Sequence, residues 1–181
     1  NAIPVEVFFL WLYWPMILAL QPLTCVLPGP IVSLVPSQTE LLHWLGLDAE
    51  VAGITRFCVH PAAWRKSKCI IGGTKNIDIY KIRTLKPSLI IANKEENVKE
   101  QVEELAADYP VFVTDVNNFE EALRMIEQVG VLTGKNVQAA ELKAAVIKRF
   151  AAFSSGRPTG LKACYLIWKD PYMTAGGDTF I

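Results

Sequence analysis

Short apolar runs alternate with longer segments of helical spacing from residue 31 onward, and this alternation most limits the folds open to the chain. The apolar runs are residues 31–35, 51–54, 69–71, 89–92 and 111–114. Segments whose apolar residues have helical spacing lie at residues 37–45, 79–85, 98–105 and 119–134. Strands that alternate with helices form a mostly parallel sheet covered on both faces. The sequence therefore predicts an α/β fold with a Rossmann-like lobe over residues 31–135.

The first of these helices is expected to begin at Ser37. Ser37 and Glu40 have the S-x-x-E spacing of a capping box, in which each side chain accepts a hydrogen bond from the backbone N–H of the other residue. Gly46 is a natural end for this helix. The segment therefore predicts a strand, a tight turn and a helix, which together open a βα unit.

A long segment without breakers follows the predicted sheet. Residues 136–153 contain neither glycine nor proline, and they repeat apolar side chains at Val137, Ala140, Ala144, Ile147 and Ala151. A helix of this length spans about 27 Å at 1.5 Å per residue. A Ser/Gly/Pro-rich loop at 154–160 comes next, and an apolar run at 162–168 then starts a new strand. We predict a connecting helix over residues 136–155 and the start of a truncated C-terminal lobe over residues 161–181.

Charge and cysteine spacing exclude some classes of function. Eighteen basic and eighteen acidic side chains cancel, and no basic stretch interleaves with aromatic residues. The chain therefore lacks the electrostatic footprint of a nucleic-acid-binding protein. The cysteines (Cys25, Cys58, Cys69 and Cys164) form no CxxC pair, which argues against a structural zinc site. Cys164 lies in an apolar run and is expected to be a free buried thiol.

Residues 1–30 form an apolar N-terminal segment. Residues 7–20 read VFFLWLYWPMILAL, which is shorter than a membrane-spanning helix and is interrupted by Pro15. The run fits the apolar region of an export signal, and Cys25 lies where a lipoprotein carries its acylated cysteine. However, no Lys or Arg precedes the run, and residues 22–24 make a poor lipobox. An export signal and a buried N-terminal segment both remain open.

Three clusters of polar residues follow predicted strands, where open parallel sheets bind ligands. Residues 36–39 (Pro-Ser-Gln-Thr) offer free backbone N–H groups to an anion or a carbonyl group, or they only cap the helix. The glycines of residues 72–76 let the backbone approach a ligand closely, or they only form a turn. In residues 93–97, Asn93 can cap the next helix, and Glu95 and Glu96 suit its positive end.

A fourth cluster, residues 56–61, contains a cysteine and a histidine. Cys58 and His60 are of the types that coordinate metals or form a nucleophile–base pair. The sequence marks neither a third metal ligand nor an orienting carboxylate and an oxyanion hole. His43, the other histidine, lies in a predicted helix and is expected to face solvent. The cluster is a surface loop whose Phe57 and Cys58 pack inward, a ligand contact, or the centre of covalent catalysis.

A fifth cluster lies beyond the last apolar run. Trp168 and Tyr172 follow this run, and a glycine pair and an aspartate come at residues 176–178. Large aromatic side chains beside glycines suit the wall of a ligand cleft. The same two aromatic side chains equally suit the core of a second lobe, so both interpretations remain open.

Several motifs together resemble one family. The segments SLVPSQTELL, GITRFCVHP, IGGTKN, LKPSLIIANKEEN, VTDVNNFEEALRMI and LIWKDPYMTAGGDTFI are similar to successive landmarks of the helical-backbone (class III) periplasmic-binding family. This family includes the vitamin B12, siderophore and haem-binding proteins of ABC importers. The resemblance covers about residues 31–181 and implies two Rossmann-like lobes joined by one long rigid helix, with the ligand held between the lobes.

The resemblance also implies which residues face the ligand. The expected contacts are Ser37, Gln38, Thr39, Phe57, Cys58, His60, Gly73, Thr74, Lys75, Asn76, Lys94, Glu95, Glu96 and Asn97 from the first lobe, and Trp168, Tyr172, Gly176, Gly177 and Asp178 from the second. The expected ligand is a metal chelate such as a corrinoid, haem or a ferric siderophore, and no catalytic residue, protein-bound metal or cofactor is expected.

The implied partner is an ABC permease in the membrane, and the implied location of this monomer is periplasmic or extracytoplasmic, with a lipid anchor as an option. Members of the family often dock on the permease through an acidic residue that precedes Lys81. Tyr80 occupies that position here, and the nearest acid is Asp78. The alternative from a different class is a Cys/His-dependent hydrolase or transferase on a doubly wound sheet, which requires an acid near His60 and a thiol of lowered pKa.

Overall fold

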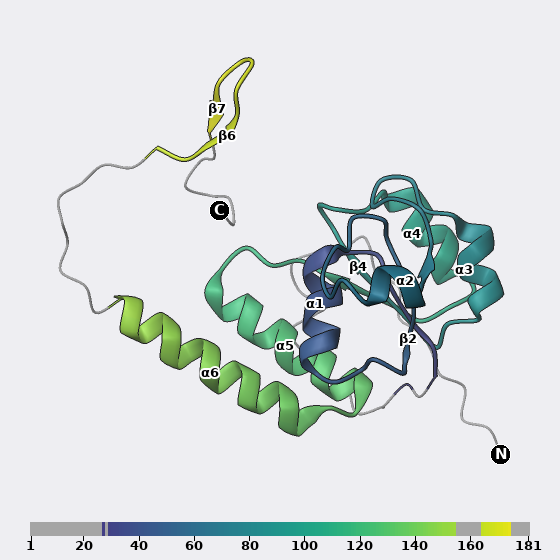
Figure 1. Ribbon diagram of the computed structural model, residues 1–181, viewed down its shortest axis with the longest axis horizontal. Coiled ribbons are helices and arrows are strands. Elements are labelled where there is room, and N and C mark those ends of the chain that lie inside the picture. The colour runs from purple at the N-terminus through teal and green to yellow at the C-terminus, as the bar shows by residue number, and fades with distance from the viewer. Residues whose placement is uncertain (1–26, 28, 155–163, 175–181) are drawn as a thin grey trace.

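Five parallel strands form the central sheet of the computed structural model, which describes residue 27, residues 29–154 and residues 164–174. The strands are β1 (Ile31–Ser33), β2 (Val51–Ile54), β3 (Cys69–Ile70), β4 (Leu89–Asn93) and β5 (Val111–Thr114). Their order across the sheet is β3-β2-β1-β4-β5. All four pairings are parallel. The predicted α/β fold with a Rossmann-like parallel sheet is confirmed (Figure 1).

The order of the strands creates a switch point between β1 and β4. From β1 the chain proceeds outward through β2 to β3, and it then crosses to the other side of β1 to form β4 and β5. The connections that leave β1 and β4 therefore run in opposite directions along the sheet. Open α/β sheets bind ligands in the crevice that such diverging connections leave at the carboxyl ends of the strands. The loops that follow β1 and β4 therefore lie at a switch point of this kind.

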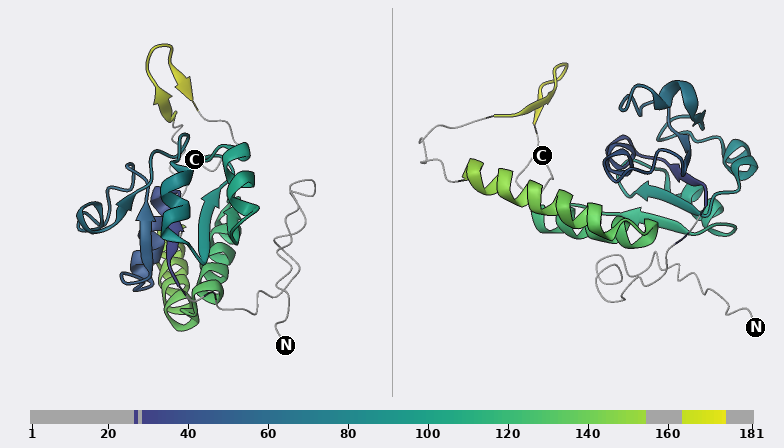
Figure 2. Two further views of the ribbon diagram at one scale, coloured as in Figure 1. Left: turned by 90° about the vertical axis from the view of Figure 1, so that its right-hand side faces the viewer. Right: turned by 60° about the horizontal axis from the view of Figure 1, so that its bottom comes forward.

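Helices cover both faces of the sheet. On one face lie α1 (Pro36–Trp44), α5 (Phe119–Thr133) and α6 (Asn136–Ser154), together with the short α2 (Trp64–Ser67). On the other face lie α3 (Ile79–Leu85) and α4 (Lys99–Ala106). Figure 1 and Figure 2 show these layers from three sides.

The alternation of side chains along each strand separates two hydrophobic cores. Leu89 and Ile91 of β4 point to the face of α1 and α5, whereas Ile90 and Ala92 point to the face of α3 and α4. All four residues are buried. Successive side chains of a strand lie on opposite faces, so a strand covered on both sides has to be apolar throughout. This requirement explains why the strands of the chain are continuous apolar runs.

Asparagine, aspartate and left-handed residues set the ends of several helices. Asp78 accepts a hydrogen bond from the backbone N–H of Lys81 at 3.0 Å and begins α3. Asn118 accepts one from the N–H of Glu121 at 2.9 Å and begins α5. Gly134 has a φ of 70° and ends α5, because glycine adopts this conformation without a Cβ clash.

Two predicted helix starts are wrong. Ser37 does not cap α1: the N-cap is Val35, Pro36 occupies the first turn, and no side chain caps the helix. Proline suits this place because it has no N–H to leave unpaired and its φ is already helical. Asn93 does not begin α4 either. Its Oδ1 accepts hydrogen bonds from the N–H groups of Glu95 and Glu96 in a turn, and the helix starts only at Lys99.

The connection after β2 contains a single helical turn, α2, in which Trp64 buries its ring in the core, at 3% exposure. One further expectation is corrected by the structure. Cys164 is an exposed thiol and not a buried one. The strand β6 (Leu166–Trp168) starts after this cysteine and pairs with β7 (Met173–Thr174) in a two-stranded antiparallel sheet of its own. β6 therefore does not join the five-stranded sheet.

The predicted helix at residues 136–153 is one continuous helix, α6. It packs antiparallel along α5, beside which it lies in all three views (Figures 1 and 2). At one end of the contact Gly130 faces Ala139, and at the other the rings of Phe119 and Phe150 stack 4.1 Å apart. Other apolar side chains of α6 are exposed, including Val137 and Ile147. Among the described residues, no helix is both long and apolar enough to cross a membrane.

Candidate functional site

Four connecting loops meet at the carboxyl edge of the sheet. They follow β1, β2, β3 and β4, and they contain all the ligand contacts predicted for the first lobe. Because the four strands are parallel neighbours, their carboxyl ends lie on one side of the sheet. The structure therefore brings residues that are up to 63 positions apart in the sequence to a common edge. We call it the carboxyl edge and define it as residues 34–39, 55–61, 72–77 and 93–97.

A buried network joins the first turn of α1 to the loop after β2. The hydroxyl of Thr39 donates to Ser33 Oγ at 2.8 Å and lies 3.1 Å from the sulfur of Cys58. Cys58 also lies 3.2 Å from the hydroxyl of Thr55. Thr39 and Thr55 are fully buried, and Cys58 is 1% exposed. These side chains bond one another, which holds α1 against the loop after β2.

Gln38 differs from its neighbours in this turn. Its side chain is 4% exposed, and among the described residues its Oε1 atom is buried without a hydrogen-bond partner. Buried polar atoms are nearly always paired, because an unpaired one has lost its hydration without a replacement. At the carboxyl edge, the Oε1 atom of Gln38 is therefore a buried acceptor that can still take a hydrogen bond.

Phe57 and Arg56 form the exposed part of the loop after β2. The Phe57 ring is 54% exposed, so the interpretation in which it packs inward holds for Cys58 but not for Phe57. The guanidinium carbon of Arg56 lies 5.8 Å from the centre of the Phe57 ring, within the range of a cation–π contact. A Cβ atom on Gly73 would come within 3.1 Å of this ring. Gly73 therefore lets the ring of Phe57 lie close against the loop after β3.

The loop after β3 is a tight turn that depends on a glycine. Gly72 has a φ of +105°, and the N–H of Gly73 donates to the carbonyl of Asn76 at 2.8 Å. A Cβ on Gly72 would lie 2.5 Å from that same carbonyl oxygen. The turn leaves Lys75 and Asn76 exposed, and the ammonium group of Lys75 donates to the carbonyl of Glu95 in the loop after β4.

Asn97 connects three of the four loops. Its Oδ1 accepts from the N–H of Asn93 at 2.8 Å, and its Nδ2 donates to the carbonyls of Leu34 at 3.3 Å and Thr74 at 3.0 Å. The residue is 7% exposed. Its amide group is thus used by the backbone of the loops after β1, β3 and β4, which leaves little of it for a ligand.

The predicted contacts therefore separate into buried and exposed groups. Gln38, Thr39, Cys58, Gly73, Thr74 and Asn97 are buried. The exposed side chains are those of Ser37, Phe57, His60, Lys75, Asn76, Lys94, Glu95 and Glu96. Lys94 pairs with Asp115 beyond the end of β5 at 3.1 Å. A molecule bound at the carboxyl edge would contact the side chains of the exposed set first.

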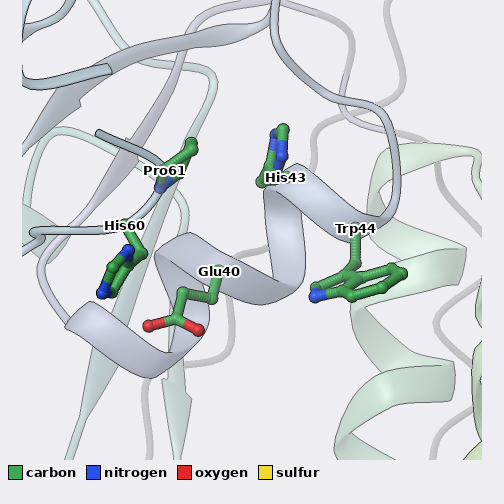
Figure 3. A pocket seen from close by; sticks show the side chains of 5 residues that line it. All are labelled: Glu40, His43, Trp44, His60 and Pro61. Atoms are coloured by element: carbon green, nitrogen blue, oxygen red, sulfur yellow. The ribbon is translucent and has the colours of Figure 1, made fainter. Parts of the chain in front are cut away.

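His60 lines a shallow hollow of about 420 Å³ beside α1. Glu40, His43 and Trp44 of α1 line the rest of this hollow with Pro61. In Figure 3 the carboxylate of Glu40 and the ring of His60 lie on the same side of the hollow, while Trp44 lies at its other end. As predicted, His43 is exposed, and its Nδ1 lies 3.3 Å from the Oδ1 atom of Asp48.

Metal and nucleophile chemistry find little support in the described part of the chain. No group of three or more His, Cys, Asp or Glu side chains there is arranged to hold a metal ion. The thiol of Cys58 is enclosed by the hydroxyls of Thr39 and Thr55, whereas His60 is exposed and borders the hollow on α1. A catalytic pair needs a nucleophile and a base within hydrogen-bond reach, and the contacts of these two side chains are with other groups.

Two carboxyl groups have shifted pKa values, and both have structural causes. The indole N–H of Trp64 donates to Asp48 at 2.8 Å and lowers the pKa of this carboxyl, with a smaller contribution from His43. The backbone N–H of Asn117 donates to Glu121 at 2.8 Å and lowers the pKa of that carboxyl. Hydrogen bonds to the ionised form favour that form. Neither carboxyl lies within the carboxyl edge.

The aromatic residues of the fifth cluster lie away from these contacts. Trp168 and Tyr172 belong to the hairpin of β6 and β7, where they are 63% and 70% exposed. The indole of Trp168 donates to the carbonyl of Asp170 within the same hairpin at 3.1 Å. Gly176, Gly177 and Asp178 lie outside the described residues, as do residues 1–26 with the export-signal segment.

The predicted ligand contacts did not include Arg56 and Asn93, although both lie in clusters that the sequence marked, and the buried hydroxyls of Ser33 and Thr55 were not predicted. Arg56 adjoins Phe57 in the same short loop, and an arginine beside an aromatic residue was a usable signal. Ser33 and Thr55 are polar residues at the ends of apolar strands, where a buried hydroxyl needs a partner. Their partners lie on other loops, and the spacing of the sequence does not identify them.

Comparisons with known proteins agree with this geometry. Residues 31–167 match the sequence profile of the family described as periplasmic binding protein. An uncharacterized ABC transporter substrate-binding lipoprotein of Bacillus subtilis is 31% identical over 120 residues, which are 64% of this chain and 37% of that protein. The vitamin B12-binding protein of Photorhabdus laumondii is 29% identical over 125 residues, which are 68% of this chain and 45% of that protein. The chain thus spans less than half the length of these relatives.

Solved structures show the same fold. A possible iron-binding (periplasmic solute-binding) protein from Staphylococcus epidermidis superposes with a TM-score of 0.71 at 25% identity, over 84% of this chain and 62% of that one. The periplasmic vitamin B12-binding protein of Vibrio cholerae superposes with a TM-score of 0.67 at 22% identity, over 81% of this chain and 60% of that one. At this identity the likeness is one of fold.

Proposed function

This chain belongs to the periplasmic binding protein family, and we propose that it is part of the substrate-binding component of an ABC importer, which captures a metal chelate outside the cytoplasm. Two relatives support this proposal, because one is named as an ABC transporter substrate-binding lipoprotein and the other as a vitamin B12-binding protein. The single observation that carries it is the convergence of four loops at the carboxyl edge beside the switch point of the sheet.

The chemistry of the carboxyl edge suits a large and rigid ligand. Phe57 offers an exposed ring, and Arg56 and Lys75 add positive charge beside it. The loops beneath these side chains are fixed by buried hydrogen bonds, so a ligand meets a surface that is already ordered. Binding to an ordered surface avoids most of the entropic cost of arranging loops. A corrinoid, haem or a ferric siderophore is rigid too and suits such a surface.

The rest of the proposed molecule follows the layout of this family. We propose residues 31–135 as the N-terminal lobe, 136–155 as the connecting helix and 161–181 as the start of the C-terminal lobe. In that layout α6 spans between the lobes, and Trp168 and Tyr172 face the ligand from the second lobe. The exposed apolar side chains Val137 and Ile147 of α6 support this layout, because a helix that borders a second lobe needs an apolar surface on that side.

Location and partner are part of the same proposal. An extracytoplasmic location of the protein is consistent with the periplasmic binding protein family and with the relative named as a lipoprotein. Cys25 is the residue proposed to carry a lipid anchor, and an ABC permease is the proposed membrane partner. The exposed Tyr80, at 78%, lies at the start of α3 and is the candidate contact with the permease.

A Cys/His-dependent enzyme is not favoured. Cys58 is buried under two hydroxyl partners, and the ring of His60 borders a different surface. Because the family and the compared structures are periplasmic binding proteins, a role in binding explains the edge better than covalent catalysis does.

Nuclear magnetic resonance on the isotope-labelled chain tests the proposal. Cyanocobalamin, haemin and a ferric catecholate siderophore are each titrated to about millimolar concentration, which detects binding as weak as about −4 kcal/mol. We expect at least one of them to change the backbone amide signals of residues 55–61, 72–77 and 93–97, and to leave those of α5 unchanged. This range of concentration reveals the contribution of one lobe even where both lobes are needed for tight capture.

Two variants show whether the exposed ring takes part. Phe57→Ala is expected to weaken the binding of the active probe about tenfold, in keeping with about 1.4 kcal/mol for a lost aromatic contact. Trp44→Ala, which removes another exposed ring, at the far end of α1, is the control and should leave binding unchanged. No signal change with any of the three probes, or changes confined to other regions, would refute the proposed function.

A further inference from the structure

We infer that Asn97 is the positioning residue that holds the carboxyl edge in its binding form; this inference rests on the proposed function. The observation behind it is that one side-chain amide, 7% exposed, bonds the backbone of three separate loops. A residue with this role touches no ligand. It acts through the loops that do.

The three hydrogen bonds of Asn97 reach across the switch point. Leu34 precedes α1 and lies 63 positions before Asn97, and Thr74 lies 23 positions before it. Asn93, whose N–H donates to Oδ1, is the last residue of β4. β1 and β4 are the neighbouring strands from which the chain leaves in opposite directions. Asn97 therefore bridges the two connections that diverge at the switch point. It also binds the loop after β3 through the carbonyl of Thr74.

The chemistry of an amide suits this place better than that of other side chains. The Oδ1 atom accepts while the Nδ2 atom donates two hydrogen bonds, so one neutral group serves an N–H and two carbonyls. Aspartate offers no donor for the two carbonyls, and serine offers a single one. A charge in a site this buried would also lose its hydration. The neutral, two-sided amide is what these three loops require.

Positioning by Asn97 reaches the exposed residues through the backbone. Thr74, whose carbonyl accepts from Nδ2, adjoins Lys75 in the loop after β3, and Asn93 adjoins the turn that carries Glu95 and Glu96. The ammonium group of Lys75 donates to the carbonyl of Glu95 and joins the loops after β3 and β4 at the surface. The buried hydrogen bond from Asn97 Nδ2 to the carbonyl of Thr74 joins the same two loops beneath it. Because this second bond is shielded from water, it sets how far apart the two loops lie.

The test compares Asn97→Asp and Asn97→Ala with the unchanged chain. Asn97→Asp keeps an acceptor for the N–H of Asn93 and removes both donors, whereas Asn97→Ala removes all three hydrogen bonds. Thr133→Val is the matched control: it loses the hydrogen bond of Thr133 Oγ1 to the carbonyl of Val129, at 2.7 Å, near the end of α5. That site lies at the opposite edge of the sheet, where Leu132 accepts from the N–H of Leu27.

Hydrogen exchange measured on the 181-residue chain gives the first readout. With Asn97→Ala we expect amides of residues 34–35, 73–76 and 93–97 to exchange at least about tenfold faster, because local opening no longer has to break the amide bridge. Asn97→Asp should affect residues 34–35 and 73–76 more than residue 93. Amides of β1 and β4 should keep their protection in both variants, as they should in Thr133→Val.

The second readout is the affinity for whichever of cyanocobalamin, haemin and the ferric catecholate siderophore binds the unchanged chain. We expect Asn97→Ala to weaken this affinity about tenfold, which corresponds to loops that adopt their binding form only about one tenth of the time. Thr133→Val should leave the affinity unchanged. Unchanged exchange in the three loops would overturn the inference, as would a general loss of protection across the whole sheet. Faster loop exchange in a chain that binds none of the probes would instead uphold the bridge and refute the proposed function.

Discussion

Substitution of Gly130 by alanine is expected to destabilise the chain, although alanine is the better helix former. In α5 a Cβ atom at this position would lie 2.4 Å from the Cβ of Ala139 on α6. Carbon atoms in contact are ordinarily about 3.5–4.0 Å apart. Both atoms are fixed directly to helix backbones, so neither can rotate away, and the two helices have to separate by about 1 Å or more.

The magnitude follows from two opposing effects. Replacing glycine by alanine inside a helix stabilises it by about 1 kcal/mol. Overpacking an interface that cannot relax by rotamer changes costs about 3 kcal/mol. Gly130→Ala should therefore lower the free energy of unfolding by about 2 kcal/mol, which corresponds to a fall in Tm of about 4–8 °C in a chain of this size.

The reciprocal change supplies the control. Ala139→Gly alone should cost about 2 kcal/mol, from about 1 for helix propensity and about 0.8 for the buried methyl group. The double variant moves this methyl group from α6 to α5 and should lie within about 1 kcal/mol of the unchanged chain. Two independent effects would instead add to about 4 kcal/mol.

Urea denaturation followed by circular dichroism measures all four members of this cycle. The expected result is a coupling energy of about 3 kcal/mol in favour of the double variant, with similar slopes against urea. If Gly130→Ala raised the stability by about 1 kcal/mol and the two substitutions were additive, the close packing of α5 on α6 would be refuted.

Three further perturbations test other parts of the chain. Gly72→Ala should lower the free energy of unfolding, measured by urea denaturation, by about 2–3 kcal/mol, because the new Cβ combines a φ of +105° with a carbonyl oxygen 2.5 Å away. Gly46→Ala should lower it by only about 1 kcal/mol, because the φ is +73° and nothing lies within 4 Å of the new Cβ. Asp48, whose pKa is lowered by the indole of Trp64, stabilises the fold when ionised, so this stability is present above the ordinary pKa of about 4 and is lost as the pH falls through the lowered value. The difference in Tm between the unchanged chain and Asp48→Asn should therefore be constant from pH 7 to 5 and shrink below about pH 4, and a gap that grew in acid would contradict this cause. Cys58→Val should be less stable than Cys58→Ser by about 1–2 kcal/mol, because valine leaves two buried hydroxyls without their sulfur partner, and equal stabilities would contradict the network.

Patterns of apolar residues predicted most of the fold. β2, β5 and α3 have the predicted bounds, and α6 covers residues 136–154 of the predicted 136–155. These elements have clear signals, such as continuous apolar strands or the aspartate that begins α3. Such signals are local, since a strand buried on both faces has to be apolar whatever covers it.

The start of α1 shows why helix ends were harder to predict. Ser37 has the correct spacing to Glu40 for a capping box, but Pro36 already has the backbone angle of a first helical residue. The helix therefore starts one residue earlier, and Ser37 lies within its first turn. Two local preferences competed, and the sequence alone does not say which of them is stronger.

The orientation of the site residues depended on distant parts of the chain. All residues predicted from the first lobe do lie at the carboxyl edge, because the strands that precede them are parallel neighbours. Whether each one points inward was not predictable. Asn97 turns inward because the carbonyls of Leu34 and Thr74 lie within its reach, and these belong to loops 63 and 23 positions away.

This division between buried and exposed residues bears on how ligand preference can change in such a protein. Replacing a buried residue such as Asn97 or Cys58 leaves polar partners unpaired and costs about 1–3 kcal/mol for each of them. Replacing exposed side chains such as Phe57, Lys75 or Glu96 ordinarily changes stability by no more than about 0.5 kcal/mol. Under the proposed function, the preference for a ligand can therefore be altered at exposed positions while the hydrogen bonds that hold the loops stay in place. The conformation of the carboxyl edge would then be a property of the fold, and the choice of ligand would rest on the few side chains that the edge presents.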